Sequence, residues 1–230
     1  MPEAIKALIA KKAAATLKNI MTDSTLKDYV ASERIPAVFI RTDDPANIRL
    51  IIIGQDPTVK KEADRAQIHT VLNLDKPNSR LYKYIHNICV RLDLDMKQQV
   101  YATNYGKNFF VRPPTQIREI NILREAGRYW IPLLKEELAY FPDQAQIITL
   151  GEPLLKALSI NSYRPKLRHF WGYTPDWQNS ESRYSFVGAA ENLLARNLYP
   201  LPHQPSLQKM FYQTRLDSYL AFIRKSLPDT

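Results

Sequence analysis

The sequence has few of the residues that build covalent or metal-bound scaffolds. Its 230 residues include a single cysteine, Cys89. One cysteine cannot form an intramolecular disulfide, and one thiolate cannot hold a structural zinc ion or an iron–sulfur cluster. We therefore expect a metal-free protein in an intracellular compartment, which would be the cytoplasm or nucleoid of a bacterium or the nucleus of another cell.

Glycine and long apolar runs are also scarce. Gly54 and Gly151 stand singly, and neither a Gly-rich dinucleotide fingerprint nor a P-loop is present. The densest apolar patch, 50–53, is far shorter than the roughly 18 consecutive apolar residues of a transmembrane helix. Residues 1–21 are rich in Ala and Lys and lack the apolar stretch of a secretory signal. We expect no membrane span and interpret 1–21 as a first helix.

Positive charge is what the sequence has in excess. Lys and Arg number 32 against 23 Asp and Glu, which gives a formal net charge of +9. Such an excess attracts polyanions and favours DNA as a partner, although charge alone fits a role in solubility equally well. The hydrophobic and charged fractions, 45% and 24%, are close to globular averages. We expect a monomer with one domain over 1–230, in which 1–35 form an N-terminal helical extension.

Strand and helix patterns alternate along the chain. Short apolar runs predict strands at 48–53, 100–103, 147–150 and 198–201, with a further candidate at 184–187. Apolar residues at helical spacing predict helices after a cap at Ser79, after a cap at Thr115, and over 152–158 and 207–227. This alternation is typical of an α/β protein. We predict a three-layer α/β/α sandwich with a central, mostly parallel four-stranded sheet.

Four positions follow closely on the predicted strands. Asp56, Asn104, Gly151 and His203 each come within a few residues of a strand end. In open parallel sheets, the ligand site lies beyond the carboxyl ends of the strands. We therefore expect these sequence-distant positions to meet in one crevice.

Two short motifs frame this set of strands. Gly54-Gln55-Asp56-Pro57 follows the first strand, and His203 with Pro205-Ser206 follows the last. The first motif resembles the first signature of the uracil-DNA glycosylase superfamily, and the second resembles its His-Pro-Ser signature. The segments 100–104, 112–114, 148–151 and 154–158 look like the middle of the thermophile-type branch, in the same order. The resemblance runs from about Val38 to the C-terminus.

The resemblance implies a DNA glycosylase that hydrolyses the N-glycosidic bond of uracil, or of a related deaminated or damaged base, without a cofactor. Asp56 would stabilise positive charge on the sugar and orient the attacking water. His203 would act as a neutral imidazole that donates a hydrogen bond to O2 of the departing base. Each residue also has a plainer interpretation, because Asp-Pro is a common turn and a histidine in a Pro-rich loop is usually a surface residue.

The resemblance also assigns residues that hold the base. Gly54 and Gln55 would line the base pocket, and Leu72 or His69 would stack on the base. The Asn104 amide would accept from N3–H of uracil and donate to O4, an arrangement that rejects cytosine. Asn104 is alternatively a turn or cap residue after a strand.

Residues after His203 are assigned to DNA, because the target nucleotide has to leave the duplex. Leu207 would be the intercalating wedge, Ser206 would grip a phosphate, and Lys209 would add charge. Leu207 fits equally well as the first core residue of the last helix. A further loop either contacts the strand or forms a satellite hydrophobic cluster, and it contains Arg164, Lys166, Arg168, His169, Phe170 and Trp171.

The chain departs from the family at three points. It lacks the four cysteines of the iron–sulfur cluster in the thermophile-type branch, Thr58 replaces an aromatic residue that excludes thymine, and Gln204 interrupts the second signature. We therefore predict weak excision of bases bulkier than uracil. Two other classes of protein remain open: a nucleic-acid-binding protein that has lost catalysis, and a small-molecule enzyme of nucleotide type.

Overall fold

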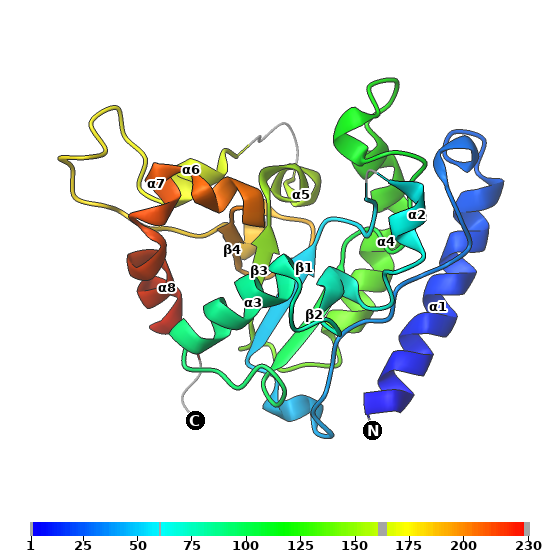
Figure 1. Ribbon diagram of the computed structural model, residues 1–230, viewed down its shortest axis with the longest axis horizontal. Coiled ribbons are helices and arrows are strands. Elements are labelled where there is room, and N and C mark those ends of the chain that lie inside the picture. The colour runs from blue at the N-terminus through cyan, green and yellow to red at the C-terminus, as the bar shows by residue number, and fades with distance from the viewer. Residues whose placement is uncertain (1, 60, 161–164, 228–230) are drawn as a thin grey trace.

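A four-stranded parallel sheet forms the centre of the protein. The computed structural model describes residues 2–59, 61–160 and 165–227. The strands are β1 (Leu50–Gly54), β2 (Val100–Asn104), β3 (Gln146–Leu150) and β4 (Leu198–Leu201), in the spatial order β2-β1-β3-β4. Each neighbouring pair is parallel. Helices lie on both sides of this sheet, which confirms the predicted three-layer α/β/α sandwich (Figure 1).

Two groups of helices cover the sheet. The helices are α1 (Pro2–Thr22), α2 (Glu62–Arg65), α3 (Arg80–Arg91), α4 (Ile122–Leu138), α5 (Glu152–Leu158), α6 (Leu167–Phe170), α7 (Met210–Gln213) and α8 (Leu216–Arg224). The connections β1–α3–β2 and β2–α4–β3 run in opposite directions across the sheet, so right-handed crossovers place α3 and α4 on opposite faces. Consistent with this, α4 contacts α1 and α5, whereas α3 contacts α8.

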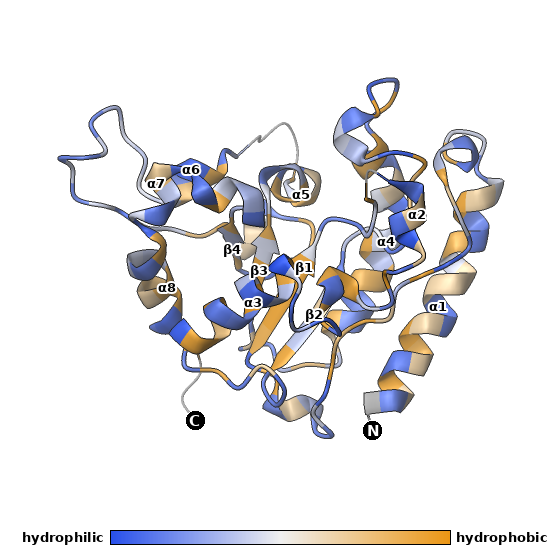
Figure 2. Cartoon of the chain, in the orientation of Figure 1, coloured by the Kyte–Doolittle hydropathy of each residue, from blue (hydrophilic) through white to orange (hydrophobic). Residues whose placement is uncertain are grey.

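The central strand β1 and its neighbour at the edge of the sheet, β2, are both buried. All five residues of β1 and all five of β2 are buried. Figure 2 shows hydrophobic residues concentrated on β1. β1 appears in the sequence as a short unbroken apolar run, which is why its position was predicted to within two residues.

The predicted start is confirmed for one helix and wrong for another. Ser79 caps α3, because its Oγ accepts a hydrogen bond from the backbone N of Tyr82 at 3.0 Å. The next helix, α4, begins at Ile122 with Asn121 as its cap, and not at 116. Thr115 lies instead in a short 3₁₀ turn, Pro114–Gln116. The prediction failed because a capping side chain closer to the helix, that of Asn121, supplies the acceptor.

The C-terminal segment is more broken than predicted. The single helix expected over 207–227 is divided into a 3₁₀ turn, Gln204–Gln208, and the helices α7 and α8. Arg215 stands between α7 and α8, and its guanidinium donates hydrogen bonds to the backbone carbonyls of Trp171 and Trp177. The strand expected at 184–187 is also absent from the described residues, where Tyr184 and Val187 make isolated bridges.

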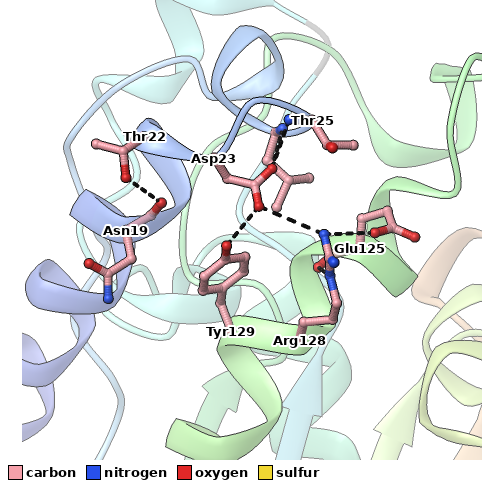
Figure 3. A network of polar contacts seen from close by, with 8 residues as sticks. Asn19, Thr22, Asp23, Thr25, Glu125, Arg128 and Tyr129 are labelled. Atoms are coloured by element: carbon pink, nitrogen blue, oxygen red, sulfur yellow. Dashed lines mark hydrogen bonds and ion pairs between the residues drawn. The ribbon is translucent and has the colours of Figure 1, made fainter.

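The N-terminal helix packs on the sandwich. Ile9, Ala13, Leu17 and Ile20 of α1 are buried at helical spacing, and α1 contacts α4. Just after α1, the carboxylate of Asp23 accepts a hydrogen bond from the hydroxyl of Tyr129 in α4 at 2.7 Å (Figure 3). The extension predicted for 1–35 is therefore joined to the core, and its long helix ends at Thr22, followed by a short 3₁₀ turn, Lys27–Tyr29. Among the helices of the described ranges, none is long and apolar enough to cross a membrane.

Candidate active site

The strands all end at one edge of the sheet. Gly54, the last residue of β1, pairs in parallel register with Asn104, the last residue of β2. Gly151 directly follows β3, and His203 lies two residues after β4. Parallel topology therefore places Asp56, Asn104, Gly151 and His203 along the same edge, at the carboxyl ends of the strands.

The Asp56 carboxylate is held by the residues beside it in the chain. Its Oδ2 accepts from Nε2 of Gln55, and its Oδ1 accepts from the backbone N of Thr58, both at 2.8 Å. Burial raises the pKa of Asp56 above its ordinary value, and the hydrogen bonds from Thr58 and Gln55 oppose that rise. The two hydrogen bonds fix the orientation of the carboxylate. Burial makes its charged form less stable than that of an exposed aspartate.

Thr58 connects the turn after β1 to the loop after β2. Its Oγ1 accepts from the backbone N of Phe110 at 2.8 Å. Its backbone N donates to Oδ1 of the Asp56 carboxylate at 2.8 Å, and the presence of Thr58 favours the charged form of Asp56. The residue to which the resemblance assigns base specificity therefore also supports the carboxylate.

Gly54, Leu72 and Asn104 are in close contact. A β-carbon built on Gly54 would lie 2.4 Å from Oδ1 of Asn104 and 2.7 Å from Cδ2 of Leu72. Asn104 is only 2% exposed, and its Oδ1 has no hydrogen-bond partner among the residues that the structure describes. Buried amide oxygens are usually paired, so this atom marks a position that suits a donor from a ligand.

Leu72 adopts a backbone conformation that side-chain-bearing residues rarely take. Its φ is +55° and that of Asn73 is +54°. Strain of this kind is concentrated at functional sites. His69, the alternative for stacking on the base, is exposed, and its Nδ1 is hydrogen-bonded to Nη2 of Arg34 at 2.9 Å. The structure therefore places Leu72, and not His69, against Gly54.

A cavity of about 450 Å³ adjoins this group. This volume lies within the usual range for ligand pockets, about 300–1,000 Å³. Among the residues discussed above, Gln55, Gly151, His203, Ser206 and Lys209 line it. The rest of the lining is formed by Thr115, Leu150, Glu152, Pro153, Leu167, Pro202 and Tyr212.

The candidate residues thus fall into two neighbouring groups. Gln55 and His203 share the cavity, whereas Asp56, Leu72 and Asn104 are not part of its lining. Gln55 joins the groups, because it lines the cavity and donates a hydrogen bond to Asp56. The sequence predicted that Asp56, Asn104 and His203 would meet in one crevice. In this structure the cavity contains His203 and Gln55, and Asp56 and Asn104 lie outside its lining.

His203 lies exposed at the edge of the cavity. Partial burial of its imidazole lowers the pKa of His203 below the ordinary value, which favours the neutral ring. Gly151 shapes the wall beside it: its φ is +95°, and a β-carbon at this position would lie 3.6 Å from Cβ of His203. Glycine is favoured there because other residues rarely adopt this conformation.

Two of the three residues assigned to DNA line the cavity. Ser206 is partly buried, and its backbone N donates to the carbonyl of His203 at 2.8 Å, while Lys209 is exposed. Leu207 is partly buried and packs against the hydrophobic core. This packing agrees with the alternative interpretation of Leu207 as a core residue.

The aromatic and basic loop is largely occupied with internal packing. Phe170 and Trp171 are buried. The guanidinium of Arg168 lies 4.1 Å from the ring centroid of Tyr173. Arg164 lies outside the described residues.

A buried ion pair behind Asn104 was not predicted from the sequence. Nζ of Lys107 lies 2.8 Å from Oε1 of Glu137, with side chains only 4% and 1% exposed. The same Nζ donates to the backbone carbonyl of Asn104 at 3.1 Å and to Oγ1 of Thr103 at 2.7 Å. Glu137 occupies a core position of α4, and a charged residue at such a position is the signal that identifies this pair.

Comparison with known proteins does not identify a family. No protein-family model matches the chain, and a search of curated proteins finds no match. Within residues 2–59, 61–160 and 165–227, no three His, Cys, Asp or Glu side chains gather closely enough to hold a metal ion. The sequence resemblance and the geometry of the strand ends are therefore the two supports for a function.

Proposed function

We propose that this chain is a monofunctional DNA glycosylase that hydrolyses the N-glycosidic bond of uracil, or of a related deaminated or damaged base, in base-excision repair. The observation that carries the proposal is the buried, unpaired Asn104 amide oxygen against Gly54. It lies at the strand edge that also holds Asp56 and His203. The resemblance of 54–57 and 203–206 to the two superfamily signatures supports the same assignment.

The chemistry requires stabilisation of two opposite charges. As the bond between C1′ and the base breaks, the base leaves with the electron pair, positive charge develops on the sugar, and water adds to C1′. An ionised Asp56 would stabilise the sugar cation and orient the water, and its contacts with Gln55 and Thr58 hold it in one direction.

His203 would stabilise the negative charge on the departing base. A neutral imidazole carries one ring N–H, which can donate to O2 of uracil. The lowered pKa of His203 supports this role, because the ring stays neutral over more of the pH range.

Asn104 supports selection of a base with an imino donor. Uracil N3–H would supply the missing partner of Oδ1, whereas cytosine has an acceptor at N3 and would leave that oxygen unpaired. Such a loss amounts to about 1–3 kcal/mol. Because Leu72 shares the space over Gly54, we expect the incoming base to displace the Leu72 side chain. The uncommon backbone conformation of Leu72 supports such a movement.

The net positive charge of the chain suits DNA as a partner. The chain carries a net charge of +9, and Lys209 and Ser206 line the cavity beside His203. A cationic side chain and a hydroxyl group are among the groups that commonly contact phosphates. These groups would hold the strand while the target nucleotide is extruded.

Excision from a labelled oligonucleotide that contains one uracil tests this proposal. The reaction is run in chelator, and alkali then cleaves any abasic site. We expect strand scission with the natural chain and a roughly 100- to 1,000-fold slower reaction with Asp56→Asn, which removes the charge and keeps the shape. Asp143→Asn is the matched control, because Asp143 is exposed and precedes β3 at the opposite edge of the sheet.

The same assay with thymine, hypoxanthine and xanthine opposite different bases tests the role of Thr58. We expect weak excision of these bulkier bases, because Thr58 supplies no aromatic barrier. A strict preference for uracil would contradict that expectation.

A nucleic-acid-binding protein without catalysis is the second candidate. One observation favours it: Asp56 is not part of the cavity lining, and both of its oxygens are already hydrogen-bonded, to Gln55 and Thr58. Tight DNA binding without scission in the assay would support this candidate and contradict the glycosylase.

A further inference from the structure

Three consecutive carbonyl groups lead to His203, and each accepts a hydrogen bond from a different part of the fold. Nε1 of Trp171 donates to the carbonyl of Pro200, the backbone N of Gly151 donates to that of Leu201, and the hydroxyl of Tyr84 donates to that of Pro202. All three distances are 2.8 Å. Each of the three residues before His203 is therefore held by a hydrogen bond to its carbonyl group.

The bond from Tyr84 acts directly on His203. The carbonyl of Pro202 and the backbone N of His203 belong to one planar peptide unit, so the direction of the carbonyl fixes one side of the His203 Cα. On the other side, the carbonyl of His203 accepts from the backbone N of Ser206 at 2.8 Å. Both peptide planes that flank His203 are thus restrained. The direction of its Cα–Cβ bond, along which the side chain leaves the backbone, is restrained with them.

Tyr84 comes from a distant and rigid part of the chain. It lies in α3 on the core side, is 5% exposed, and is 118 residues from Pro202. Burial in apolar surroundings raises the pKa of its hydroxyl well above the ordinary value, so the group stays protonated and remains a donor. A phenyl ring would fill the same core position, and what the hydroxyl adds is its bond to Pro202.

We propose that Tyr84 is a positioning residue for His203, which sets the orientation of the imidazole through the Pro202 carbonyl. The inference rests on the proposed function, in which His203 contacts the departing base. Tyr84 itself lies behind the cavity wall, because Pro202 lines the cavity and Tyr84 does not. Its effect is therefore on the rate of bond cleavage, and not on the affinity for DNA.

The test compares Tyr84→Phe with a matched variant, Tyr105→Phe. Tyr105 is also buried, and its hydroxyl also donates to a backbone carbonyl at 2.8 Å, that of Leu123 in α4. Both variants lose one buried hydroxyl-to-carbonyl bond, so both should lower the thermal unfolding temperature to a similar extent. Only Tyr84→Phe releases the peptide that precedes His203.

Two readouts are measured on the full chain. The first is the single-turnover rate of uracil excision together with the dissociation constant for the same oligonucleotide. The second is the NMR signal of the His203 imidazole C–H group, assigned with His203→Gln. We expect Tyr84→Phe to slow excision on the order of 10- to 100-fold at unchanged DNA affinity and to shift the His203 signal. Tyr105→Phe should leave the excision rate and the signal as they are.

The two readouts separate this inference from the proposed function. If the natural chain excises uracil and Tyr84→Phe matches Tyr105→Phe in rate, or leaves the His203 signal in place, the positioning role is overturned. If the natural chain does not excise uracil, the proposed function fails. The His203 signal then still decides whether Tyr84 orients that side chain.

Discussion

The last residue of β1 and the last residue of β2 are in direct contact: a β-carbon on Gly54 would lie 2.4 Å from Oδ1 of Asn104. The parallel register pairs these two residues, and the buried amide lies over the Gly54 backbone. Any larger residue at position 54 would require the Asn104 side chain to move. Glycine at this position therefore makes room for the amide that we propose reads the base.

Replacement of Gly54 by alanine tests this relationship. The new methyl group would collide with Oδ1 of Asn104 and with Cδ2 of Leu72, at 2.7 Å, so both side chains have to shift. Overpacking of this kind lowers the free energy of unfolding by about 1–3 kcal/mol. Displacement of the amide should slow uracil excision on the order of 100-fold. Urea unfolding and single-turnover excision measure the two effects.

Gly188→Ala is the control for that variant. Its β-carbon would lie 3.3 Å from Oε2 of Glu191, the end of an exposed side chain that accepts a hydrogen bond from the backbone N of Gly188, and a small shift of this side chain relieves the contact. We expect little change in stability or in excision. Normal excision by Gly54→Ala would show that the position of the Asn104 amide does not matter for the reaction.

The pH dependence of excision follows from Asp56 and His203. In the proposed reaction Asp56 acts as an anion, and burial raises its pKa, so its working form is lost at a higher pH than that of an ordinary aspartate. In the same proposal His203 acts as a neutral ring, and burial lowers its pKa, so its working form persists below the ordinary value of 6.5. The single-turnover rate should be level at neutral and alkaline pH and fall on the acidic side, where both groups take up protons.

A variant separates the two titrations. His203→Gln removes the titration of the imidazole. The residual excision rate should then fall at low pH with the slope expected for one protonation, that of Asp56. A rate that increases as the pH is lowered from 7 would contradict the assigned protonation states.

Thr58 should contribute to stability as well as to specificity. In Thr58→Val, the buried backbone N–H of Phe110 loses its acceptor, the hydroxyl of Thr58. We expect the free energy of unfolding to fall by about 1–3 kcal/mol. Thr58→Ser keeps the hydroxyl and should retain most of that stability. Equal unfolding curves for the valine and serine variants would show that the hydroxyl is not needed.

The features predicted correctly from the sequence have local causes. β1 was recognisable because a strand buried on both faces is an unbroken apolar run. Ser79 was recognisable because a capping side chain bonds to a backbone N three residues later. The placement of Asp56, Asn104 and His203 at one sheet edge followed from parallel topology alone.

The features that were missed depend on contacts between distant residues. Tyr84 looks like any core residue of an amphipathic helix until its hydroxyl is seen 2.8 Å from the carbonyl of Pro202. Lys107 resembles a surface lysine until it is found paired with Glu137. Asn104 and Leu72 pack against Gly54 and do not line the cavity that contains Gln55 and His203. The spacing of these residues along the chain does not reveal such packing.

Asp23 offers a test of how the N-terminal helix is attached. Its Oδ2 accepts from the hydroxyl of Tyr129, its Oδ1 accepts from the backbone N of Thr25 at 2.8 Å, and Arg128 lies 3.7 Å away (Figure 3). These contacts, first of all the hydrogen bond from Tyr129, lower the pKa of Asp23 below its ordinary value of 3.8. A carboxyl group with a lowered pKa stabilises the folded state above that ordinary value, and the contribution is lost as the pH falls through the folded-state pKa.

Asp23→Asn should therefore unfold at a lower temperature than the natural chain at pH 7, and the difference should shrink below pH 3.8 and disappear as the pH falls through the lower folded-state pKa. Because Asp23 joins the end of α1 to α4, the backbone amides of α1 should also exchange hydrogen faster in the variant, while those of β1 stay protected. Asp28→Asn, at an exposed aspartate five positions later, is the control and should change neither measurement. Uniformly faster exchange in α1 and β1 would show instead that Asp23 supports the whole fold and does not act as a local attachment of α1.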